Sequence, residues 1–250
     1  MIIAPGNLQY IGSANPPYWK FADRQYEYFG NNGQGSDAVN VDRDLFGWGT
    51  SGWNSGANCY QPWSTSDNWI DYRPGGDANN DLTGAYAYAD WGINNVIRNA
   101  PGLWRSLTDE EQRYIFLYRS ASTVNGVPNA RFTEGMVNGV EGLFLFPDQY
   151  VHPAGVPQPE GIDDQGHGFS QNHYSATEWL SMETAGAVFL PCAGYRQGTT
   201  LYSQGESGYY WTSTHFSIGS AYYTYVGIYS APGRVQERDD GMSVRLVRNQ

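Results

Sequence analysis

Hydrophobic and polar residues alternate over short segments near both ends of the chain, and helical spacing is confined to its middle. Alternation with a period of two, bounded by Gly, Pro, Asn or Asp, is typical of β-strands. Alternating segments and short apolar runs between turn residues occur at 6–12, 18–30, 142–147, 187–196, 208–214, 220–229 and 242–248. The last of these alternates Met242, Val244 and Leu246 with Ser243 and Arg245, and Arg248 ends it. We therefore expect short strands in these segments.

The first expected helix spans 106–121. Thr108 and Glu111 have the spacing of a capping box, in which each side chain bonds the backbone N–H of the other residue. Acidic residues between them favour the positive end of the helix dipole. Apolar residues then recur at helical spacing, at Tyr114, Leu117 and Tyr118.

The second expected helix spans 175–186 and begins with the same type of cap, formed by Ser175 and Glu178. A Trp and a Met three residues apart give it an apolar side, and Gly186 supplies a C-terminal stop. A third and shorter helix is expected over about 90–98.

The order of these elements favours an α+β fold. Strands come first, followed by long loops, the two helices and a C-terminal third made of strands. Strands and helices that are segregated along the chain argue for an antiparallel sheet rather than an alternating α/β fold. Because no repeat and no linker divides the sequence, we expect a single domain spanning 1–250. It would contain two main helices, a twisted antiparallel sheet and long ordered loops.

The longest loop, 31–85, is dominated by Gly, Asn, Asp, Ser and Trp. A polar loop of this length without large side chains would stay disordered. Here aromatic residues recur through it, at Phe46, Trp48, Trp53, Trp63 and Trp69. In the whole chain, aromatic residues make up 16% and glycine contributes 31 residues. We therefore expect the loops to be ordered by rings that pin them in place.

The charge balance argues against two classes of partner. The formal net charge is −11, and Lys20 is the only lysine beside 13 arginines, which form no basic run. Nucleic-acid binding and attachment to an anionic membrane both need clustered positive charge. An apolar span of about 20 residues, which direct membrane insertion needs, is also missing from the sequence. The N-terminus lacks a signal-peptide pattern, and we conjecture an export signal upstream of Met1.

Candidate nucleophiles have little local support. No Gly-x-Ser-x-Gly elbow occurs, and the 4 histidines lie in loop-like or turn-like settings. Cys192 lies in an apolar segment as a small filler, and Cys59 has no neighbouring cation to lower its pKa. The two cysteines are compatible with one disulfide or with two free thiols. Paired carboxylates for glycoside hydrolysis stay an open alternative, because their geometry is three-dimensional.

Two clusters of oxygen-bearing side chains are candidates for a cation site. The first comprises Asp77, Asn79, Asn80 and Asp81, and the second comprises Asp163, Asp164 and His167. Neither is accompanied by the rest of a calcium loop, and no pair of His or Cys has zinc-ligand spacing. Clusters of Asn, Asp and Gly arise more often because these residues form turns. We therefore expect no metal and no cofactor.

The stretch 208–235 concentrates aromatic residues among Ser, Thr, Gly and Ala. Tyr210, Trp211 and Tyr223 are expected to pack in the core. In the expected strand 220–229, both alternating sets of side chains contain tyrosines, so some rings must face outward. Tyr and Trp beside small polar residues are typical of antibody-like surfaces, because rigid rings lose little entropy on binding. The stretch therefore indicates a ligand-binding surface.

Several motifs, taken in order, resemble a family of paralogous domains found in surface proteins of gut Bacteroidetes. They are GNLQY, LFGWGTSGW, LWRSLTDEEQRYIF, FLPCAGYR, GYYWTST and GMSVRLVR, which together span nearly the whole chain. These domains are similar to the C-terminal domain of Legionella collagen-like adhesins. The resemblance implies a C-type lectin-like fold, in the branch shared with formylglycine-generating enzymes. Such a fold has two helices and a twisted antiparallel sheet.

Some members of this fold are variable proteins of diversity-generating retroelements, in which mutagenesis at adenines rewrites a C-terminal stretch. Mutated AAC codons do not reach Gln, Glu, Lys, Met or Trp, and residues 212–235 contain none of these types. The resemblance implies a variable ligand-binding region at 208–248. Its framework residues would be Trp211, Ala221, Pro232, Arg238 and Gly241. Its exchangeable ligand contacts would be His215, Phe216, Ser217, Ile218, Tyr222, Thr224, Tyr225, Tyr229 and Arg234.

The chain departs from two branches of this fold. Calcium-dependent lectins hold their ion with Glu-Pro-Asn or Gln-Pro-Asp together with Trp-Asn-Asp. This chain offers only Gln158-Pro159-Glu160, upstream of the second helix. Formylglycine-generating enzymes need paired cysteines near the C-terminus, whereas Cys192 stands alone there. The resemblance therefore implies neither calcium-dependent sugar binding nor that enzyme's chemistry.

The function that the sequence favours is a non-enzymatic binding module displayed on a cell surface or a virion. Its partner would be a protein or glycan ligand on a target surface, which meets the aromatic face made by 209–239. Two alternatives stay open. One is an enzyme, either of the formylglycine-generating branch or a carboxylate-based hydrolase. The other is a structural subunit of a pilus tip or virion.

Overall fold

The computed structural model describes residues 1–30, 36–98, 100–163, 166 and 168–249. Its helical elements are η1 (Trp69–Tyr72), η2 (Gly84–Ala89), α1 (Trp91–Asn94), α2 (Asp109–Arg113), the π-helical turn η3 (Tyr114–Tyr118) and α3 (Ala176–Thr184). The strands before α2 are β1 (Ile2–Ile3), β2 (Leu8–Ile11), β3 (Tyr18–Phe21), β4 (Val96–Ile97), β5 (Ala100–Pro101) and β6 (Arg105–Ser106). The strands between η3 and β11 are β7 (Phe132–Val137), β8 (Val140–Leu145), β9 (His173–Tyr174) and β10 (Val188–Pro191). The remaining strands are β11 (Tyr195–Gln197), β12 (Thr200–Tyr202), β13 (Gly208–His215), β14 (Ser220–Val226), β15 (Ala231–Glu237) and β16 (Leu246–Arg248).

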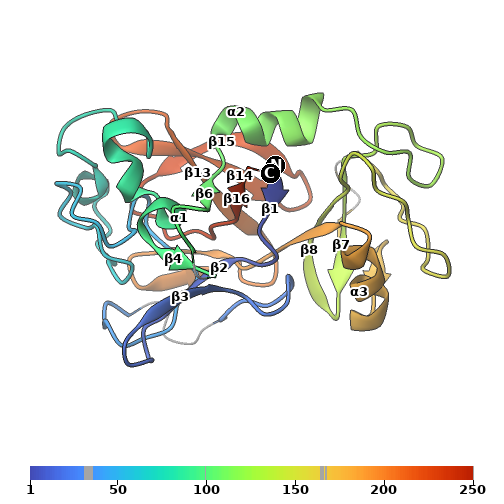
Figure 1. The fold of residues 1–250 in the computed structure, drawn as a ribbon, viewed down its shortest axis with the longest axis horizontal. Helices are drawn as coiled ribbons and strands as arrows, with labels where there is room; N and C mark the ends of the chain where they lie inside the picture. Colours follow the sequence, from blue (N-terminus) through green and yellow to red (C-terminus); the bar gives the residue numbers. More distant parts are fainter. Residues whose placement is uncertain (31–35, 99, 164–165, 167, 250) are drawn as a thin grey trace.

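These strands form several small sheets (Figure 1). A four-stranded sheet has the order β10-β8-β7-β9, and two three-stranded sheets have the orders β1-β16-β6 and β13-β14-β15. The other strands pair as ribbons, β2 with β3, β4 with β5 and β11 with β12. β7 and β9 run parallel, and the other paired strands of the described residues run antiparallel. The predicted α+β class, rich in strands and with few helices, is confirmed at this level.

Helix α2 begins with the predicted capping box. The Glu111 N–H donates to Thr108 Oγ1 at 3.1 Å, and the Thr108 N–H donates to Glu111 Oε2 at 3.0 Å. The same Glu111 carboxylate accepts hydrogen bonds from both terminal nitrogens of Arg105, each at 2.7 Å. The start of α2 is therefore tied to strand β6, which holds the helix over the sheet β13-β14-β15 (Figure 1).

The predicted helix 106–121 is shorter in the structure, and its apolar face is different. It widens into η3 and ends at Tyr118. A π-helical turn has more residues than an α-helical turn, so side chains beyond it are rotated. Ile115 and Phe116 are buried as a result. The side chains that recur at helical spacing are exposed, namely Tyr114, Leu117 and Tyr118.

Helix α3 agrees with its prediction at both ends. Ser175 and Glu178 form the capping box, and Gly186 follows the last turn with φ +102°, a left-handed conformation that favours glycine. The predicted helix 90–98 is reduced to α1, because Asn95 is extended and its side-chain amide donates to Trp91 O at 2.9 Å. This hydrogen bond satisfies a carbonyl that a longer helix would have used.

Strand predictions fail where tertiary contacts decide the structure. β7 and β15 have no counterpart among the predicted strands. β15 begins with Ala-Pro-Gly and has little alternation, and it forms because β14 provides a pairing edge.

The predicted segment 187–196 is divided into β10 and β11. Gly194 lies between them at φ +74°, where a residue with a side chain would be strained.

Residues 242–248 run through the centre of the molecule. The Leu8 N–H donates to Val244 O at 2.9 Å from one side, and the Trp211 N–H donates to Ser243 O at 3.1 Å from the other. Further along, β16 lies between β1 and β6. The side chains of residues 242–247 are buried in both alternating sets, including Arg245, because the segment is covered on both faces. Its alternation in sequence therefore marks no solvent-exposed face.

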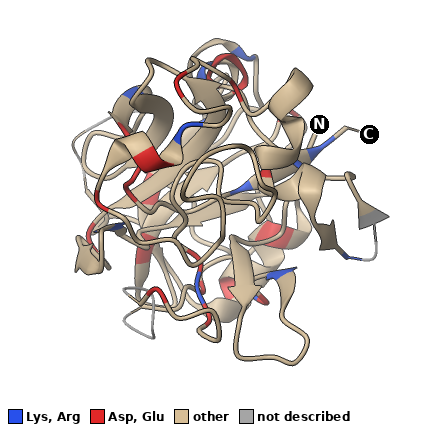
Figure 2. Cartoon of the chain, turned by 90° about the vertical axis from the view of Figure 1, so that its left-hand side faces the viewer, with Lys and Arg blue, Asp and Glu red and all other residues tan. Residues whose placement is uncertain are grey.

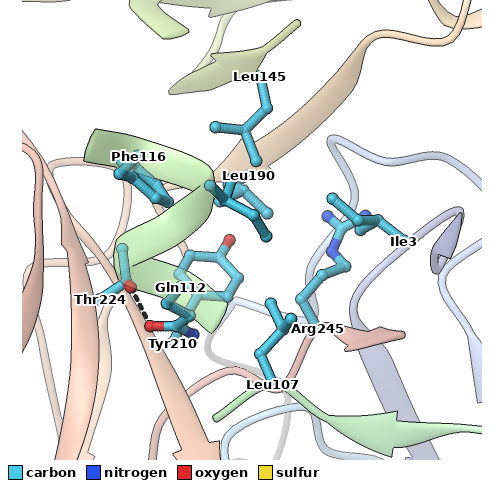
Figure 3. Close-up of a pocket in the computed structure, with 10 residues that line it drawn as sticks. Ile3, Leu107, Gln112, Phe116, Leu145, Leu190, Tyr210, Thr224 and Arg245 are labelled. Atoms are coloured by element: carbon cyan, nitrogen blue, oxygen red, sulfur yellow. Dashed lines mark hydrogen bonds between the residues drawn. The ribbon is translucent and has the colours of Figure 1, made fainter. Parts of the chain in front are cut away.

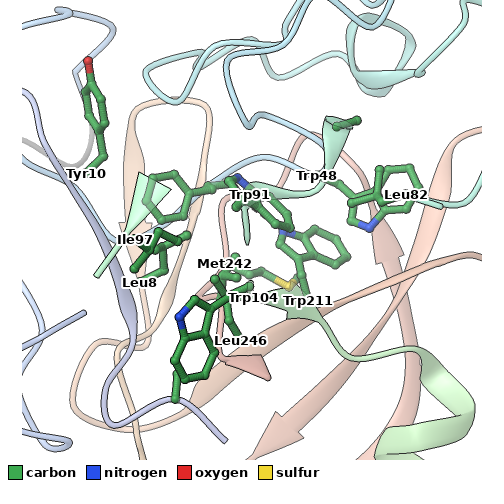
Figure 4. Packing of buried hydrophobic residues seen from close by; sticks show 14 of the residues in the cluster. Leu8, Tyr10, Trp48, Leu82, Trp91, Ile97, Trp104, Trp211, Met242 and Leu246 are labelled. Atoms are coloured by element: carbon green, nitrogen blue, oxygen red, sulfur yellow. Dashed lines mark hydrogen bonds between the residues drawn. The ribbon is translucent and has the colours of Figure 1, made fainter. Parts of the chain in front are cut away.

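Hydrophobic clusters lie on both faces of the central strands. Figure 4 shows part of the first cluster, with Trp48, Trp91, Trp104, Trp211, Met242 and Leu246. In β13, Trp211 belongs to this first cluster and its neighbour Tyr210 to the second. In β8, Leu143 belongs to the second cluster and Phe144 to the third. Each cluster thus shares a strand with the next.

Buried arginines hold the loops in place. Arg43, Arg196, Arg238 and Arg245 are almost fully buried. Arg196 donates to three backbone carbonyls, those of Leu45, Gly198 and Ser64. Arg43 donates to the carbonyls of Val41, Ser36 and Ala38. A guanidinium has five N–H donors in a planar fork, which suits several carbonyls at once, whereas a lysine ammonium does not. This use accounts for the preference for arginine over lysine in the sequence.

Candidate ligand-binding surface

The aromatic stretch forms the sheet β13-β14-β15, and its side chains divide between two faces. Tyr209 lies opposite Tyr225, and Trp211 lies opposite Tyr223, so these rings share one face. Arg234 lies opposite Tyr223 on the next strand and belongs to the same face. The other face carries Tyr210, Tyr222 and Thr224 and lies under helix α2.

On the first face, aromatic rings form a series from the core to the surface. It starts at the buried Trp211, whose ring centroid is 6.3 Å from that of Tyr223. Tyr223 is 5.8 Å from Tyr209, which also lies 5.5 Å from Tyr225 and 4.8 Å from Tyr195. Tyr195 stacks on Tyr202 at 5.2 Å. We call Tyr195, Tyr202, Tyr209, Tyr223 and Tyr225 the tyrosine cluster. Tyr202 is 42% exposed and the other four are half-buried.

Three hydroxyl groups of the cluster, those of Tyr195, Tyr209 and Tyr223, stay protonated at neutral pH. Burial raises the pKa of Tyr209 to about 12, and it also raises the pKa values of Tyr195 and Tyr223. The Tyr225 hydroxyl is 3.0 Å from Ser207 Oγ. The cluster therefore offers neutral rings with hydroxyl groups that can donate or accept, which is a chemistry suited to binding rather than to proton abstraction.

Buried carboxylates lie beside the cluster. Gln236, which shares the face of Tyr223, donates from Nε2 to Asp240 Oδ2 at 2.6 Å. Oδ1 of Asp240 and Oδ1 of Asp239 are buried and have no hydrogen-bond partner. Burial raises the pKa of Asp240 to about 6. Asp239 and Glu237 also raise it, while the Gln236 hydrogen bond and Arg196 act in the opposite direction.

On the opposite face, Phe216 and Tyr222 pack edge to face with ring centroids 5.4 Å apart. The Arg113 guanidinium lies 5.8 Å from the Tyr222 ring and is held by Asp109 at 2.6 Å. Thr224 is buried under α2, where its hydroxyl donates to Gln112 Oε1. The predicted ligand contact at Thr224 is therefore not on the surface. Phe216 is 55% exposed and remains accessible.

The turn between β13 and β14 carries three more of the predicted contacts, His215, Ser217 and Ile218. The His215 N–H donates to Asp81 Oδ1 at 2.9 Å, and the ring Nδ1 lies 2.5 Å from the same oxygen. Arg238 fixes the turn by donating to Ser217 O at 2.7 Å. Ser217 and Ile218 are partly exposed.

The predicted contacts thus do not form one continuous face. Tyr225 and Arg234 lie with the tyrosine cluster, and Phe216 and Tyr222 lie on the α2 side. Tyr229 is 61% exposed in the loop after β14. The predicted burial of Tyr210 and Trp211 is confirmed, whereas Tyr223 is only partly buried. Sequence reasoning missed Tyr195, Tyr202 and Asp240, and the pairing of β11 with β12 that presents two of these rings had no visible signal.

The oxygen-rich clusters are used for structure. Asp77 pairs with Arg73 at 2.9 Å, and Asp81 binds His215 as described. Asp163 accepts from the Arg131 N–H at 2.8 Å and pairs with the Arg131 guanidinium at 2.7 Å. Asp164 and His167 lie outside the described residues. Within the described part of the chain, no group of three or more His, Cys, Asp or Glu is arranged to hold a metal ion.

Both cysteines are free thiols, which decides between the two alternatives left open by the sequence. Cys192 is buried, as its apolar surroundings predict. Burial raises the pKa values of both thiols, Cys192 more strongly than Cys59. Since the thiolate is the reactive form, neither group is activated as a nucleophile.

Two hollows lie beside α2 and η3. The one under α2, shown in Figure 3, has a volume of about 20 Å³ and lies between Tyr210, Arg245 and Gln112. Such a space holds roughly one water molecule. A larger groove of about 490 Å³ runs past Tyr114, Arg119 and Asp148. Arg119 is engaged there by Asp148 at 2.7 Å and by the backbone carbonyl of Phe146.

Charge and hydropathy add little to this site. Figure 2 shows Lys and Arg scattered among Asp and Glu on the face in view. Among the described residues, no helix combines the length and apolar character needed to cross a bilayer. Comparisons of the chain with family models, curated proteins and solved structures find no match.

Proposed function

We propose that this chain is a non-enzymatic ligand-binding module with a C-type lectin-like fold, displayed on a cell surface or virion. Its ligand, a protein or glycan on a target surface, would meet the tyrosine cluster together with Arg234. The observation that carries this proposal is the continuous series of rings from buried Trp211 to exposed Tyr202. Partly exposed rings that rest on buried ones present a large contact area with few remaining rotamers.

The support beneath the rings is rigid. Trp211 Nε1 donates to Phe46 O at 2.9 Å, and Trp48 Nε1 donates to Thr212 O at 2.8 Å. Thr212 Oγ1 donates across the sheet to Tyr222 O at 2.9 Å. These bonds fix the strands before a ligand arrives, so little ordering remains to oppose binding.

The burial pattern also supports a variable surface on a constant framework. The framework residues implied by the resemblance are buried at Trp211, Ala221, Arg238 and Gly241, and Pro232 is partly buried. Among the exchangeable positions, Phe216 and Tyr229 are exposed, and only Thr224 is fully enclosed. A fold of this kind can accept substitutions at the exposed exchangeable positions without loss of its core.

The proposal is tested by measuring binding of the purified chain to panels of glycans and of surface proteins. Replacing Tyr202 and Tyr225 with Ser is expected to weaken any binding detected at least tenfold. Tyr88→Ser, which removes an exposed ring of η2 outside the tyrosine cluster, is the matched control and should leave affinity unchanged. If Phe216→Ser abolishes binding and the cluster variant does not, the ligand meets the α2 side. Absence of binding to either panel at micromolar concentrations of chain would contradict the proposal.

A further inference from the structure

The tyrosine cluster and the carboxylates beside it form one electrostatic unit. Asp240 is fully buried and acts electrostatically on both Tyr195 and Tyr223, which flank it from β11 and β14. Gln236 on β15 bonds one of its oxygens, and the other oxygen has no hydrogen-bond partner. The residues that follow Tyr195 and Asp240, Arg196 and Gly241, form a backbone bridge, so the buried carboxylate lies beside the cluster and not at the solvent boundary.

The nearby positive charges offset this unit only in part. Arg196 favours the ionised forms of Asp240 and Asp239, while its nitrogens donate to the carbonyls of Leu45, Gly198 and Ser64 and not to either carboxylate. Arg234 on the edge strand β15 is exposed to solvent. The carboxylates of Asp239 and Glu237 add negative charge near Asp240 and raise its pKa further. The balance around the rings is thus acidic, as is that of the whole chain at −11.

This arrangement attracts positive charge for two separate reasons. The face of a tyrosine ring carries negative electrostatic potential and attracts cations that lie over it. A buried carboxylate with an unpartnered oxygen is poorly solvated, and a cation in front of it stabilises the ionised form. An anionic group would be repelled by both features, and a neutral sugar would gain from the rings alone.

We propose that the tyrosine cluster binds the cationic side chain of a protein ligand, an ammonium or guanidinium group, with Asp240 as the buried charge beside the rings. This inference rests on the proposed function. It narrows the class of ligand from a protein or glycan to a protein with a basic surface. The aromatic rings would provide the contact area, and Asp240 would provide the selectivity for positive charge.

The test uses choline as a minimal cation and 3,3-dimethylbutan-1-ol as its neutral isostere. Each is titrated into the full chain while the tyrosine ring-proton signals are followed by nuclear magnetic resonance. Choline is expected to shift these signals saturably at millimolar concentration, and the isostere is expected to bind at least fivefold more weakly. Equal binding of the two compounds would overturn the proposal, because they differ in charge and hardly in shape.

Three variants separate the roles of the charges. Asp240→Asn is expected to weaken choline binding severalfold, and Arg234→Gln is expected to strengthen it, since it removes a competing cation. Asp77→Asn removes the same unit of charge at an exposed site that pairs with Arg73, and it should have no effect. Thermal unfolding of each variant establishes that it is folded. If Asp77→Asn weakens choline binding as much as Asp240→Asn does, the affinity depends on the overall charge of the protein, and a local site at Asp240 is contradicted.

Binding should also depend on pH through Asp240. With a pKa of about 6, its ionised fraction rises roughly tenfold between pH 5 and pH 7, and choline affinity should rise by up to that factor. The groups that face Asp240 are Asp239, Glu237, Arg196, Tyr195 and Tyr223. The rise should be absent in Asp240→Asn. A rise of the same size in that variant would assign the effect to a neighbour and overturn the role of Asp240.

The two proposals fail in distinguishable ways. If choline and its isostere bind equally but Tyr202 and Tyr225 variants still lose a glycan or protein ligand, only the cation inference is overturned. If the Tyr202 and Tyr225 variants change nothing in the panel experiment, the binding function of the cluster itself is contradicted.

Discussion

Arg245 lies between the N-terminal segment and strand β10, and its guanidinium joins them. It donates to Asn7 Oδ1 and Ala4 O at 3.0 Å each, to Gln25 Oε1 at 3.2 Å and to Phe189 O at 2.6 Å. All of these acceptors are neutral. Burial lowers the pKa of Arg245 to about 10, so the group remains charged at neutral pH and depends on these dipoles for its solvation.

Arg245→Lys is expected to destabilise the protein by about 2–4 kcal/mol, because one ammonium cannot reach acceptors on three separate segments. Urea unfolding measures the loss. Arg24→Lys, an exposed conservative change, is the control and should lie close to wild type. Equal stability of Arg245→Lys and wild type would show that the buried charge, and not the geometry of the fork, is what the site requires.

Asp240 should make stability depend on pH in a direction opposite to that of a paired carboxylate. Its folded-state pKa of about 6 lies above the unfolded value of roughly 3.9, so the folded state binds the proton more tightly. The free energy of unfolding therefore falls as pH rises from about 4 to about 6, by up to ~3 kcal/mol for this group.

Asp240→Asn should remove that slope. The difference in unfolding free energy between variant and wild type is expected to grow from pH 4 to pH 7 in favour of the variant. Urea titrations at pH 4, 5, 6 and 7 measure it, and other buried acids such as Asp90 cancel because both proteins contain them. A difference that stays constant with pH would mean that Asp240 is ionised throughout this range.

Among the elements, β10 shows how a sheet edge is closed by side chains. It is the first strand of its sheet, with β8 on one side only. On the other side, Gln25 Oε1 accepts from the Phe189 N–H at 2.9 Å, and the Tyr210 hydroxyl donates to Pro191 O at 2.6 Å. An unpaired edge offers its backbone groups to other chains, and these side chains occupy them instead.

Gln25→Met keeps the length of the side chain and removes its amide. It is expected to destabilise the protein by about 2 kcal/mol, because the buried Phe189 N–H loses its acceptor. Amide hydrogen exchange at Phe189 should accelerate more than exchange at Leu145, which lies inside the same sheet. Gln149→Met, at an exposed position, is the control. Unchanged exchange at Phe189 would show that the edge is protected by burial alone.

The elements also show which local signals can be read from sequence. Both capping boxes were predicted correctly, because the interacting residues are three positions apart and need no other part of the chain. β15 was missed because its residues show little preference for a strand until β14 pairs with them. The apolar stripe of the first helix was misplaced because the π-helical turn η3 changes the helical register, and tertiary packing decides where such a turn occurs.

For the molecule as a whole, the sequence predicted the class of fold and the location of an aromatic sheet, but not its surface. Alternation correctly implied that some rings in β14 face outward. It could not show that α2 covers Thr224, nor that β11 and β12 bring Tyr195 and Tyr202 beside Tyr209. The buried Asp240 was equally invisible, because an acidic residue in a turn-like segment gives no indication of burial.

The central position of residues 242–248 has a consequence for how the chain acquires its structure. Leu8 and Ala4 bond to Val244 and Leu246, so partners that meet in the core are separated by almost the entire polypeptide. Pairings this distant in sequence close slowly, since a long loop must be ordered before any contact forms. During synthesis, the first strands leave the ribosome well before their partners exist. The core can close only after residue 248 has been translated, so the N-terminal strands must wait for their partners while the intervening residues are made.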